Sequence, residues 1–469
     1  MKNPSCRVTV ALLLVSLTAG CAQYSSDGGF TAVERITRDK ISGDVKWTRT
    51  EKERDAVSTR VRDLLTKPLS VDDAVQVALL NNRGLQADFA ELGIAESDLV
   101  DAGRLPNPGF SYRRTRRGEE IEIERGLQFN LARLLAMPFA IRMESQRMET
   151  AQSRAALAVI RLAGDTRKAY FQAVAATETV RYMRQVQEAA DAGAELAQRM
   201  AVAGNWSRLQ QAREQVYYAD AALNVARAEQ ASVRAREALT RLLGSSGAQT
   251  MYTLPERLPD LPKAADERPD IEQRAMETRL DVQSAKRDTE SLASNLGLSK
   301  ATRFINVLEA GVTRETSNIE PVRRGYEISL ELPLFDWGTT RVAKAETRYM
   351  QAVDRTAQIA VDARSQVRES YQAYRTSYDI ARHYRDEVVP IRKRIADENM
   401  LRYNGMLIGV FELLADARLQ ISSVNSYIEA LREFWLAESD LQMAMIGQPG
   451  RPDAARAMTM TTETTSGDH

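Results

Sequence analysis

The sequence predicts a mixed, mainly α-helical fold in which long antiparallel coiled-coil helices alternate with four β-strands. Three observations predict this fold class. Long stretches carry apolar residues at helical spacing, two pairs of short segments alternate apolar with polar residues, and the whole pattern occurs twice along the 469 residues. Glycine and proline number only 24 and 14, which favours long uninterrupted elements.

The composition disfavours several function classes. Lys and Arg number 64 and balance 64 Asp and Glu, and this zero net charge argues against nucleic acid as a partner. His383 and His469 are the only histidines, and no phosphate-binding, dinucleotide-binding or zinc-protease motif occurs. Methionines such as Met400 and Met406 could bind soft metal ions during transport, but methionines on helices more typically fill the hydrophobic core. We therefore expect no enzyme, no metal site and no cofactor.

The N-terminal residues 1–20 have the pattern of a secretory signal. A short basic start precedes an apolar run at 8–17, which is too short to span a bilayer, and small residues follow. The Ala-Gly-Cys sequence ending at Cys21 resembles a bacterial lipobox, whose cysteine carries a covalent lipid, although Thr18 stands where leucine is usual. Residues 21–68 are then expected to be a lipid-anchored linker, and the alternative is cleavage without a lipid.

The rest of the chain shows an internal two-fold repeat at an offset of about 201 residues. Four pairs of segments match in the same order: 126–131 with 327–332, 171–173 with 371–373, Gly204 with Gly405, and 243–244 with 446–447. Each repeat predicts a helix, a strand hairpin, a long helix, a tight turn and a returning helix. The expected divisions are a first repeat at 69–244, a proline-rich connector at 245–268, a second repeat at 269–447 and a disordered tail at 448–469.

Each repeat contains one predicted strand hairpin. The strands at 121–131 and 326–332 alternate apolar with acidic or polar residues, and their partners are expected at 110–115 and 304–313. Such alternation is typical of barrel strands with lipid outside and water inside, although a half-buried strand of a soluble sheet alternates in the same way. Because four strands leave open edges in lipid, closure requires several chains, and three chains with about 12 strands are the smallest set with a lumen. The pattern therefore predicts a trimeric 12-stranded transmembrane β-barrel.

Long helices account for most of the remaining chain. Residues 139–203 and 339–403 predict helices of about 65 residues, interrupted only by Pro390 and each on the order of 100 Å long. Shorter helices are expected at 71–104, 205–243, 270–295 and 406–446, so that a short helix stacked on a returning helix matches one long helix in length. Coiled-coil seams are predicted at Ala212, Val216, Ala219, Leu223 and Ala226, and at Val410, Leu414, Ala417, Ile421, Val424, Ile428, Leu431 and Trp435.

Several segments resemble the TolC-like outer-membrane efflux proteins, in their lipoprotein form. They are 69–82 in the opening helix, 102–108 before the first strand, Arg-Pro-Asp-Ile at 268–271, Leu-Pro-Leu-Phe-Asp-Trp-Gly at 332–338, and the turn at 403–405 with 412–417 after it. The resemblance covers about residues 69–447. It departs at 133–138, where the Gly-rich passage from strand to helix is absent.

The resemblance implies a homotrimer in the outer membrane, with a lipid anchor and a helical α-barrel crossing the periplasm. It also implies docking to a periplasmic adaptor protein and an inner-membrane pump, so that the chain passively conducts substrates in a tripartite efflux system. The alternatives are the outlet duct of a type I protein secretion system and a periplasmic coiled-coil scaffold. The sequence does not distinguish between drugs, metal ions, solvents and polypeptides as the cargo.

Two groups of residues are candidates for control of such a conduit. Glu412 and Asp416 lie one helical turn apart and share a face, so three chains could place six carboxylates around a pore constriction that favours cations. An ordinary solvated helix face is the alternative. The periplasmic tip turns are expected at Gly204 and at Asn404 and Gly405, near which the helix pairs would open like an iris.

Overall fold

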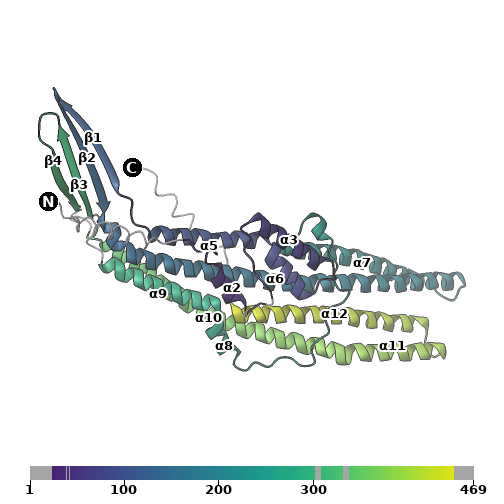
Figure 1. The fold of residues 1–469 in the computed structure, drawn as a ribbon. Helices are drawn as coiled ribbons and strands as arrows, with labels where there is room; N and C mark the ends of the chain where they lie inside the picture. The colour runs from purple at the N-terminus through teal and green to yellow at the C-terminus, as the bar shows by residue number, and fades with distance from the viewer. Residues whose placement is uncertain (1–23, 39, 42, 302–307, 331–336, 448–469) are drawn as a thin grey trace. The chain divides into compact units, whose positions relative to one another are not determined.

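The computed structural model describes residues 24–38, 40–41, 43–301, 308–330 and 337–447 (Figure 1). The predicted signal, the lipidation at Cys21 and the C-terminal tail lie outside the described residues. So do the predicted start of the third strand at 304–307 and most of the predicted strand-to-helix passage at 332–338. None of the described helices is long and apolar enough to cross a membrane.

The predicted class, mainly helical with four antiparallel strands, is confirmed. In chain order the described elements are α2 (Phe30–Arg38), α3 (Glu51–Leu65), α4 (Val71–Asn81), α5 (Arg83–Ala102), β1 (Gly109–Arg117), β2 (Glu120–Asn130), α6 (Leu131–Val202), α7 (Arg208–Leu243), η1 (Gly247–Thr250), α8 (Ile271–Thr278), α9 (Leu280–Ala301), β3 (Leu308–Ser317), β4 (Arg323–Leu330), α10 (Thr339–His383), η2 (Tyr384–Val388), α11 (Val389–Asn404) and α12 (Val410–Ile446).

The chain forms two compact units. The strand unit comprises Met1–Val33, Asp88–Ala155 and Val282–Ala360, and the hairpin unit comprises Glu34–Ala87, Ala156–Asp281 and Val361–His469.

The strand unit holds one antiparallel sheet in the order β1-β2-β3-β4 (Figure 1). Gly118 makes the tight turn between β1 and β2 with a left-handed φ of 63°, a conformation that glycine adopts at little cost. The two predicted hairpins join because β2 pairs with β3, for example Gly126 with Thr313. Asn318 then ties the two hairpin turns together, since its Oδ1 accepts from the Ile121 amide at 2.7 Å.

The passage from β2 to α6 differs from the expectation. A helix was expected only from residue 139, whereas α6 begins at Leu131, directly after the strand. Asn130 explains this start, because its side-chain Oδ1 accepts the backbone N–H of Arg133 at 2.7 Å and so caps the first turn. Pro138 lies inside the helix and removes one backbone donor there.

The hairpin unit has an aromatic core between its long helices. Phe171 of α6 stacks on Trp435 of α12 with ring centroids 5.1 Å apart, and Phe434 contacts Tyr374 of α10 at 5.6 Å. The proline-rich connector closes over this core, since Leu258 and Leu261 are buried and Trp435 donates its indole N–H to the carbonyl oxygen of Pro259 at 3.1 Å.

The helices expected at 71–104 and 270–295 are each broken into two. The breaks lie at Asn82 and Arg279, whose ψ angles of 118° and 125° are extended. Each break receives the C-terminal end of a returning helix. Asn82 donates its side-chain N–H to the carbonyl of Leu242 at 2.9 Å, and Arg279 donates Nη1 to the carbonyl of Ala444 at 2.8 Å. Both junctions therefore use a side-chain donor to satisfy carbonyls left free at a helix end.

The second long helix contains one local defect. A π-helical turn, Tyr384–Val388, separates α10 from α11, and Pro390 follows it at once. Proline has no N–H and its ring crowds the carbonyl four residues earlier, so a widened turn accommodates it without ending the helix.

Gly244 provides a test of the junction between α7 and the α4–α5 break. Its φ is 63°, and a Cβ there would lie 2.6 Å from the carbonyl oxygen of Asn81. We expect Gly244→Ala to lower the free energy of unfolding by about 1 to 3 kcal/mol, measured as helix loss on heating. Gly297→Ala is the control, because a Cβ at that helical position meets open space and should be neutral or stabilising.

Candidate functional site

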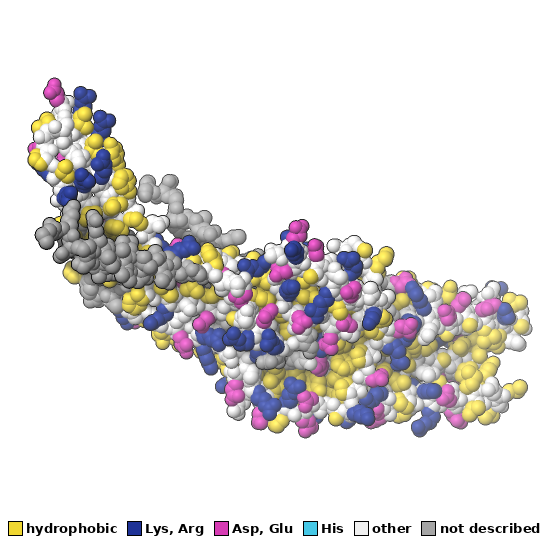
Figure 2. All heavy atoms as spheres, viewed as in Figure 1, with side chains coloured by type: hydrophobic (Ala, Val, Ile, Leu, Met, Phe, Trp, Pro, Cys, Tyr) yellow, Lys and Arg dark blue, Asp and Glu magenta, His cyan; other side chains and the backbone are white. Residues whose placement is uncertain are grey.

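The two faces of the sheet differ sharply in chemistry. Because cross-strand partners and alternate residues share a face, the strand register assigns each side chain. We define the apolar face as the one that carries Phe110, Tyr112, Leu127, Phe129, Val312, Tyr326 and Ile328, all exposed in the single chain. We define the polar face as the one that carries Glu120, Glu122, Glu124, Glu309, Glu315 and Glu327. Figure 2 shows hydrophobic and basic side chains gathered together on the strands.

The predicted turns are present at the ends of the two helical hairpins (Figure 1). The turn between α6 and α7 contains Gly204 with a left-handed φ of 77°. In the turn between α11 and α12, the left-handed residue is Met406, with φ of 58°, and Gly405 has φ of −81°. Asn404 is the last residue of α11. The two turns therefore have different backbone conformations.

Contacts join the two hairpins near these turns. Trp206 and Phe411 pack with ring centroids 5.0 Å apart. Further along, the hydroxyl of Tyr182 on α6 donates to the carbonyl of Ile421 on α12 at 3.0 Å. Burial raises the pKa of Tyr182 to about 12, so this hydroxyl keeps its proton and stays a donor at neutral pH.

A buried ion pair lies between these two contacts. Glu214 of α7 is 2% exposed, and its Oε2 accepts from the guanidinium of Arg418 on α12. The same guanidinium lies 3.9 Å from the ring centroid of Tyr217. Oε1 of Glu214 is buried and has no hydrogen-bond partner among the described residues. Arg418 is thus the group that compensates this buried charge.

The two predicted constriction residues, Glu412 and Asp416, lie in different surroundings. Asp416 is partly buried and accepts a hydrogen bond from the side-chain amide of Asn399 on α11, which is itself buried. Glu412 is exposed in the first turn of α12. Sequence reasoning missed Asn399, as well as the pair of Glu214 with Arg418, because each contact joins residues of different helices.

The two predicted coiled-coil seams have different environments. Residues of the α12 seam, such as Ile428 and Leu431, are buried within the chain. The α7 seam is exposed instead, with Val216 at 60% and Leu223 at 54%, while Ala221 and Val225 of the same helix are buried. The predicted α7 seam therefore does not pack against the described residues of its own chain. Helix α7 carries two apolar stripes, and the second, with Val216 and Leu223, is exposed in the described part of the chain.

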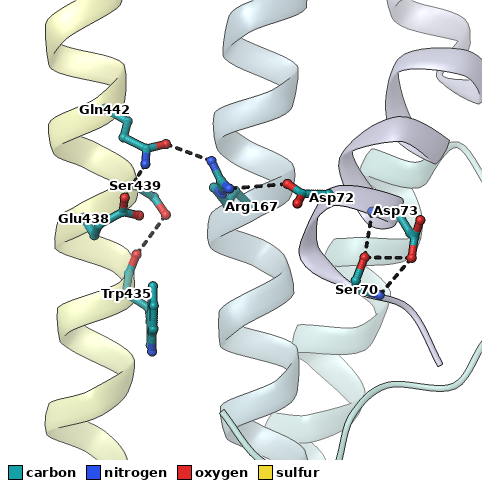
Figure 3. A network of polar contacts seen from close by, with 8 residues as sticks. All are labelled: Ser70, Asp72, Asp73, Arg167, Trp435, Glu438, Ser439 and Gln442. Carbon is teal, nitrogen blue, oxygen red and sulfur yellow. Dashed lines mark hydrogen bonds and ion pairs between the residues drawn. The ribbon is translucent and has the colours of Figure 1, made fainter. Parts of the chain in front are cut away.

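A polar network links α4, α6 and α12 in the hairpin unit (Figure 3). Arg167 of α6 donates to Oε1 of Gln442 at 2.8 Å and to Oδ1 of Asp72 at 3.5 Å. Gln442 in turn donates to Glu438. A cavity of about 340 Å³ is lined by Arg167, Lys40 and Asp72 among others. Among the described residues, no group of three His, Cys, Asp or Glu side chains is placed to hold a metal ion.

Comparisons with known proteins were made for the sequence and for the fold. No protein-family model matches the sequence. The chain is 25% identical over 280 residues to the cobalt-zinc-cadmium resistance protein CzcC of Cupriavidus metallidurans, and the match covers 57% of this chain and 64% of that protein. The chain therefore matches just under two thirds of the length of this relative.

Solved structures show the same fold over most of the chain. A membrane protein from Pseudomonas aeruginosa has a TM-score of 0.70 at 20% identity, covering 80% of this chain and 92% of that chain. The open state of the Neisseria gonorrhoeae MtrE outer-membrane channel has a TM-score of 0.67 at 18% identity, covering 81% and 89%. CusC, whose structures address transmembrane channel formation, has a TM-score of 0.65 at 16% identity, covering 83% and 92%.

The chain has the fold of an outer-membrane channel. The predicted resemblance to TolC-like outer-membrane efflux proteins is confirmed at this level, and the proteins of that fold are channels rather than enzymes. The roles of Glu412 and Asp416 as a constriction, and of Gly204, Asn404 and Gly405 as periplasmic tips, stay predictions.

Glu438 gives a pH-dependent test of the network in Figure 3. Burial raises the pKa of this carboxyl, against the opposing effect of Arg167. A raised carboxyl pKa means that the folded state holds the proton more tightly, so stability falls as pH rises past the unfolded pKa of about 4.3. We expect Glu438→Gln to raise the thermal midpoint at neutral pH and to change it little below about pH 4.

The matched control is Glu429→Gln, at an exposed position of the same helix. A gain at neutral pH that is equal for both variants, or that persists unchanged in acid, would contradict the assignment to burial of Glu438.

Proposed function

We propose that this chain is the outer-membrane channel subunit of a tripartite efflux system. In this proposal three copies close a 12-stranded transmembrane barrel, and their helical hairpins line a tunnel in the periplasm. The observation that carries the proposal is the sheet, which has an exposed apolar face, a glutamate-rich opposite face and two edge strands, β1 and β4, each paired on one side only among the described strands. This arrangement suits lipid on one side and water on the other.

The requirement for several copies follows from backbone chemistry. Each edge strand presents N–H and C=O groups that lipid cannot satisfy, so β4 of one copy must pair with β1 of the next. Because about eight strands enclose a filled interior, three copies are the smallest number that leaves a lumen. The exposed α7 seam at Val216 and Leu223 supports the same conclusion, since a second copy would cover it.

The internal repeat is supported by the two helix junctions. Asn82 and Arg279 break the paired helices at corresponding places, and Gly244 and Gly447 end the two returning helices against them. In the proposed duct these junctions make each stacked pair of helices run beside one long helix.

A covalent lipid on Cys21 is consistent with an outer-membrane location of the chain. Tyr24 lies against Arg104, with the guanidinium 5.9 Å from its ring centroid, and Arg104 precedes the start of β1 by only a few residues. Three residues of chain reach at most about 10 Å. We propose that Cys21 carries a covalent lipid that anchors the N-terminus in the outer membrane.

Opening is proposed to occur at the hairpin ends. The contacts of Trp206 with Phe411 and of Glu214 with Arg418 hold the two hairpins together, so an opening motion must break or rearrange them. Glu412 and Asp416 would set a ring of carboxylates at the constriction. The sequence contains no nucleotide-binding motif, so the adaptor and the inner-membrane pump would supply the energy.

The cargo proposed first is divalent metal cations. The relative CzcC is named for cobalt, zinc and cadmium resistance, and the six glutamates of the polar face would attract cations in a lumen. Export of polypeptides in a type I secretion system is the second candidate, because it would use the same duct.

Adjacent residues on opposite faces of β3 test the membrane assignment. We expect Val312→Lys, on the apolar face, to cost about 2 to 4 kcal/mol if that face meets the bilayer core, and to abolish heat-modifiable trimers in outer-membrane fractions. Thr313→Lys, on the polar face, should leave the trimers and their discrete conductance in planar bilayers intact. Equal tolerance of both lysines, with release of the protein by salt washing, would favour the periplasmic scaffold instead.

A second experiment tests the carboxylate ring. The double variant Glu412→Ala and Asp416→Ala should weaken block by divalent cations and raise the closed-state conductance, because the negative charge at the constriction is gone. Asn399→Ala is the control, since it removes the hydrogen bond to Asp416 and leaves both carboxylates in place. The ring is refuted if the double variant and wild type are blocked alike.

A further inference from the structure

Three arginines form a row across the apolar face of the sheet. The register pairs Arg125 on β2 with Arg314 on β3, and Arg314 with Arg324 on β4. All three side chains are exposed. Because neighbouring strands lie about 4.8 Å apart, the row brings the backbones of three arginines to one height within about 10 Å.

This row has no negative partner within its own face. The apolar face of the described strands also carries Arg114 and Arg116, and it carries no carboxylate, while all six strand glutamates lie on the polar face. No ion pair joins the three arginines of the row to a carboxylate in the described part of the chain. Since like charges directly opposite one another destabilise a sheet, an anion bound at the row would relieve this repulsion.

The position of the row along the strands indicates where that anion lies. On its helix side are the exposed apolar residues Leu127, Val312 and Tyr326, one pleat or about 7 Å away. On its other side the same face carries Ile121 and Ile123 together with Arg114 and Arg116, and the strands then reach the turns at Gly118 and Asn318. Arginine at the bilayer midplane costs about 2 to 4 kcal/mol, so a row of three belongs at a membrane border rather than in its centre.

We propose that the row of Arg125, Arg314 and Arg324 binds the phosphate groups of the glycolipid, lipid A, in the outer leaflet of the membrane. The inference rests on the proposed function, which puts the helices in the periplasm and therefore the hairpin turns outside. The planar guanidinium fork matches phosphate oxygens in a bidentate manner, and closure by three copies repeats the row three times around the barrel. Tyr112 of β1 completes each row, because it pairs with Arg125.

The test measures lipid binding by the purified full-length trimer in detergent, with native mass spectrometry counting bound lipid. Wild type should bind lipid A with both phosphates about 100-fold more tightly than dephosphorylated lipid A, since each arginine near a phosphate contributes about fivefold. The triple variant Arg125→Gln, Arg314→Gln and Arg324→Gln should lose this preference. The matched control replaces the three polar-face arginines, Arg113, Arg117 and Arg323, and should keep it.

The outcomes separate the inference from the proposed function. A conducting trimer that binds both forms of lipid A equally, that loses the preference in the control instead, or that binds phosphatidylglycerol as well as lipid A contradicts the inference alone. Displacement by excess inorganic phosphate would show a free-anion site and also contradict it. A protein that forms neither trimers nor pores contradicts the proposed function and the inference together. If the triple variant does not assemble, the wild-type comparison and the single variant Arg314→Gln still decide.

Discussion

Unpaired backbone groups at the two edges of a four-stranded sheet are the constraint on which this molecule depends. Within one chain β1 and β4 each pair on one side only, and the apolar face of the sheet is open to solvent. Lipid would cover the apolar face, but each unsatisfied N–H or C=O at the two edges would cost several kcal/mol there. In the proposed trimer, pairing of β4 with β1 of the next copy would remove this cost. In the same proposed trimer, a neighbouring copy would also cover the exposed stripe on α7.

The hairpin unit solves a different problem, which is how to end one helix on another without leaving carbonyls unsatisfied. At one junction the side chains of Asn81 and Asn82 donate to the carbonyls of residues 242–244, and at the other the buried Arg279 does so while Asp281 balances its charge. The chemistry differs while the geometry is shared. This is expected if the duplicated segments conserve the need for a donor rather than the residue that provides it.

Periodicity alone was sufficient to predict the four strands, the long helices and the turns near Gly204 and Gly405. It failed where a few side-chain hydrogen bonds decide the outcome. The cap at Asn130 starts α6 eight residues early, and the breaks at Asn82 and Arg279 depend on carbonyls more than 150 residues away in sequence. Pairing of Glu214 with Arg418 could not be predicted, because spacing within a helix carries no information on which helix lies opposite. The apolar seam of α7 was found correctly as a pattern, but a pattern does not specify whether its partner is the same chain.

The π-helical turn before Pro390 gives the two hairpins unequal stiffness. Within the hairpin unit helix α6 continues to Val202 without a proline or a π-helical turn, since its Pro138 lies in the strand unit, whereas the second long helix loses a regular hydrogen-bonding step at Tyr384–Val388. A helix with an irregular turn bends at that turn under a smaller force, and the rest of the helix keeps its regular hydrogen bonds. A force on the ends of the two hairpins should therefore bend the second hairpin at this π-helical turn, while the first hairpin stays straighter.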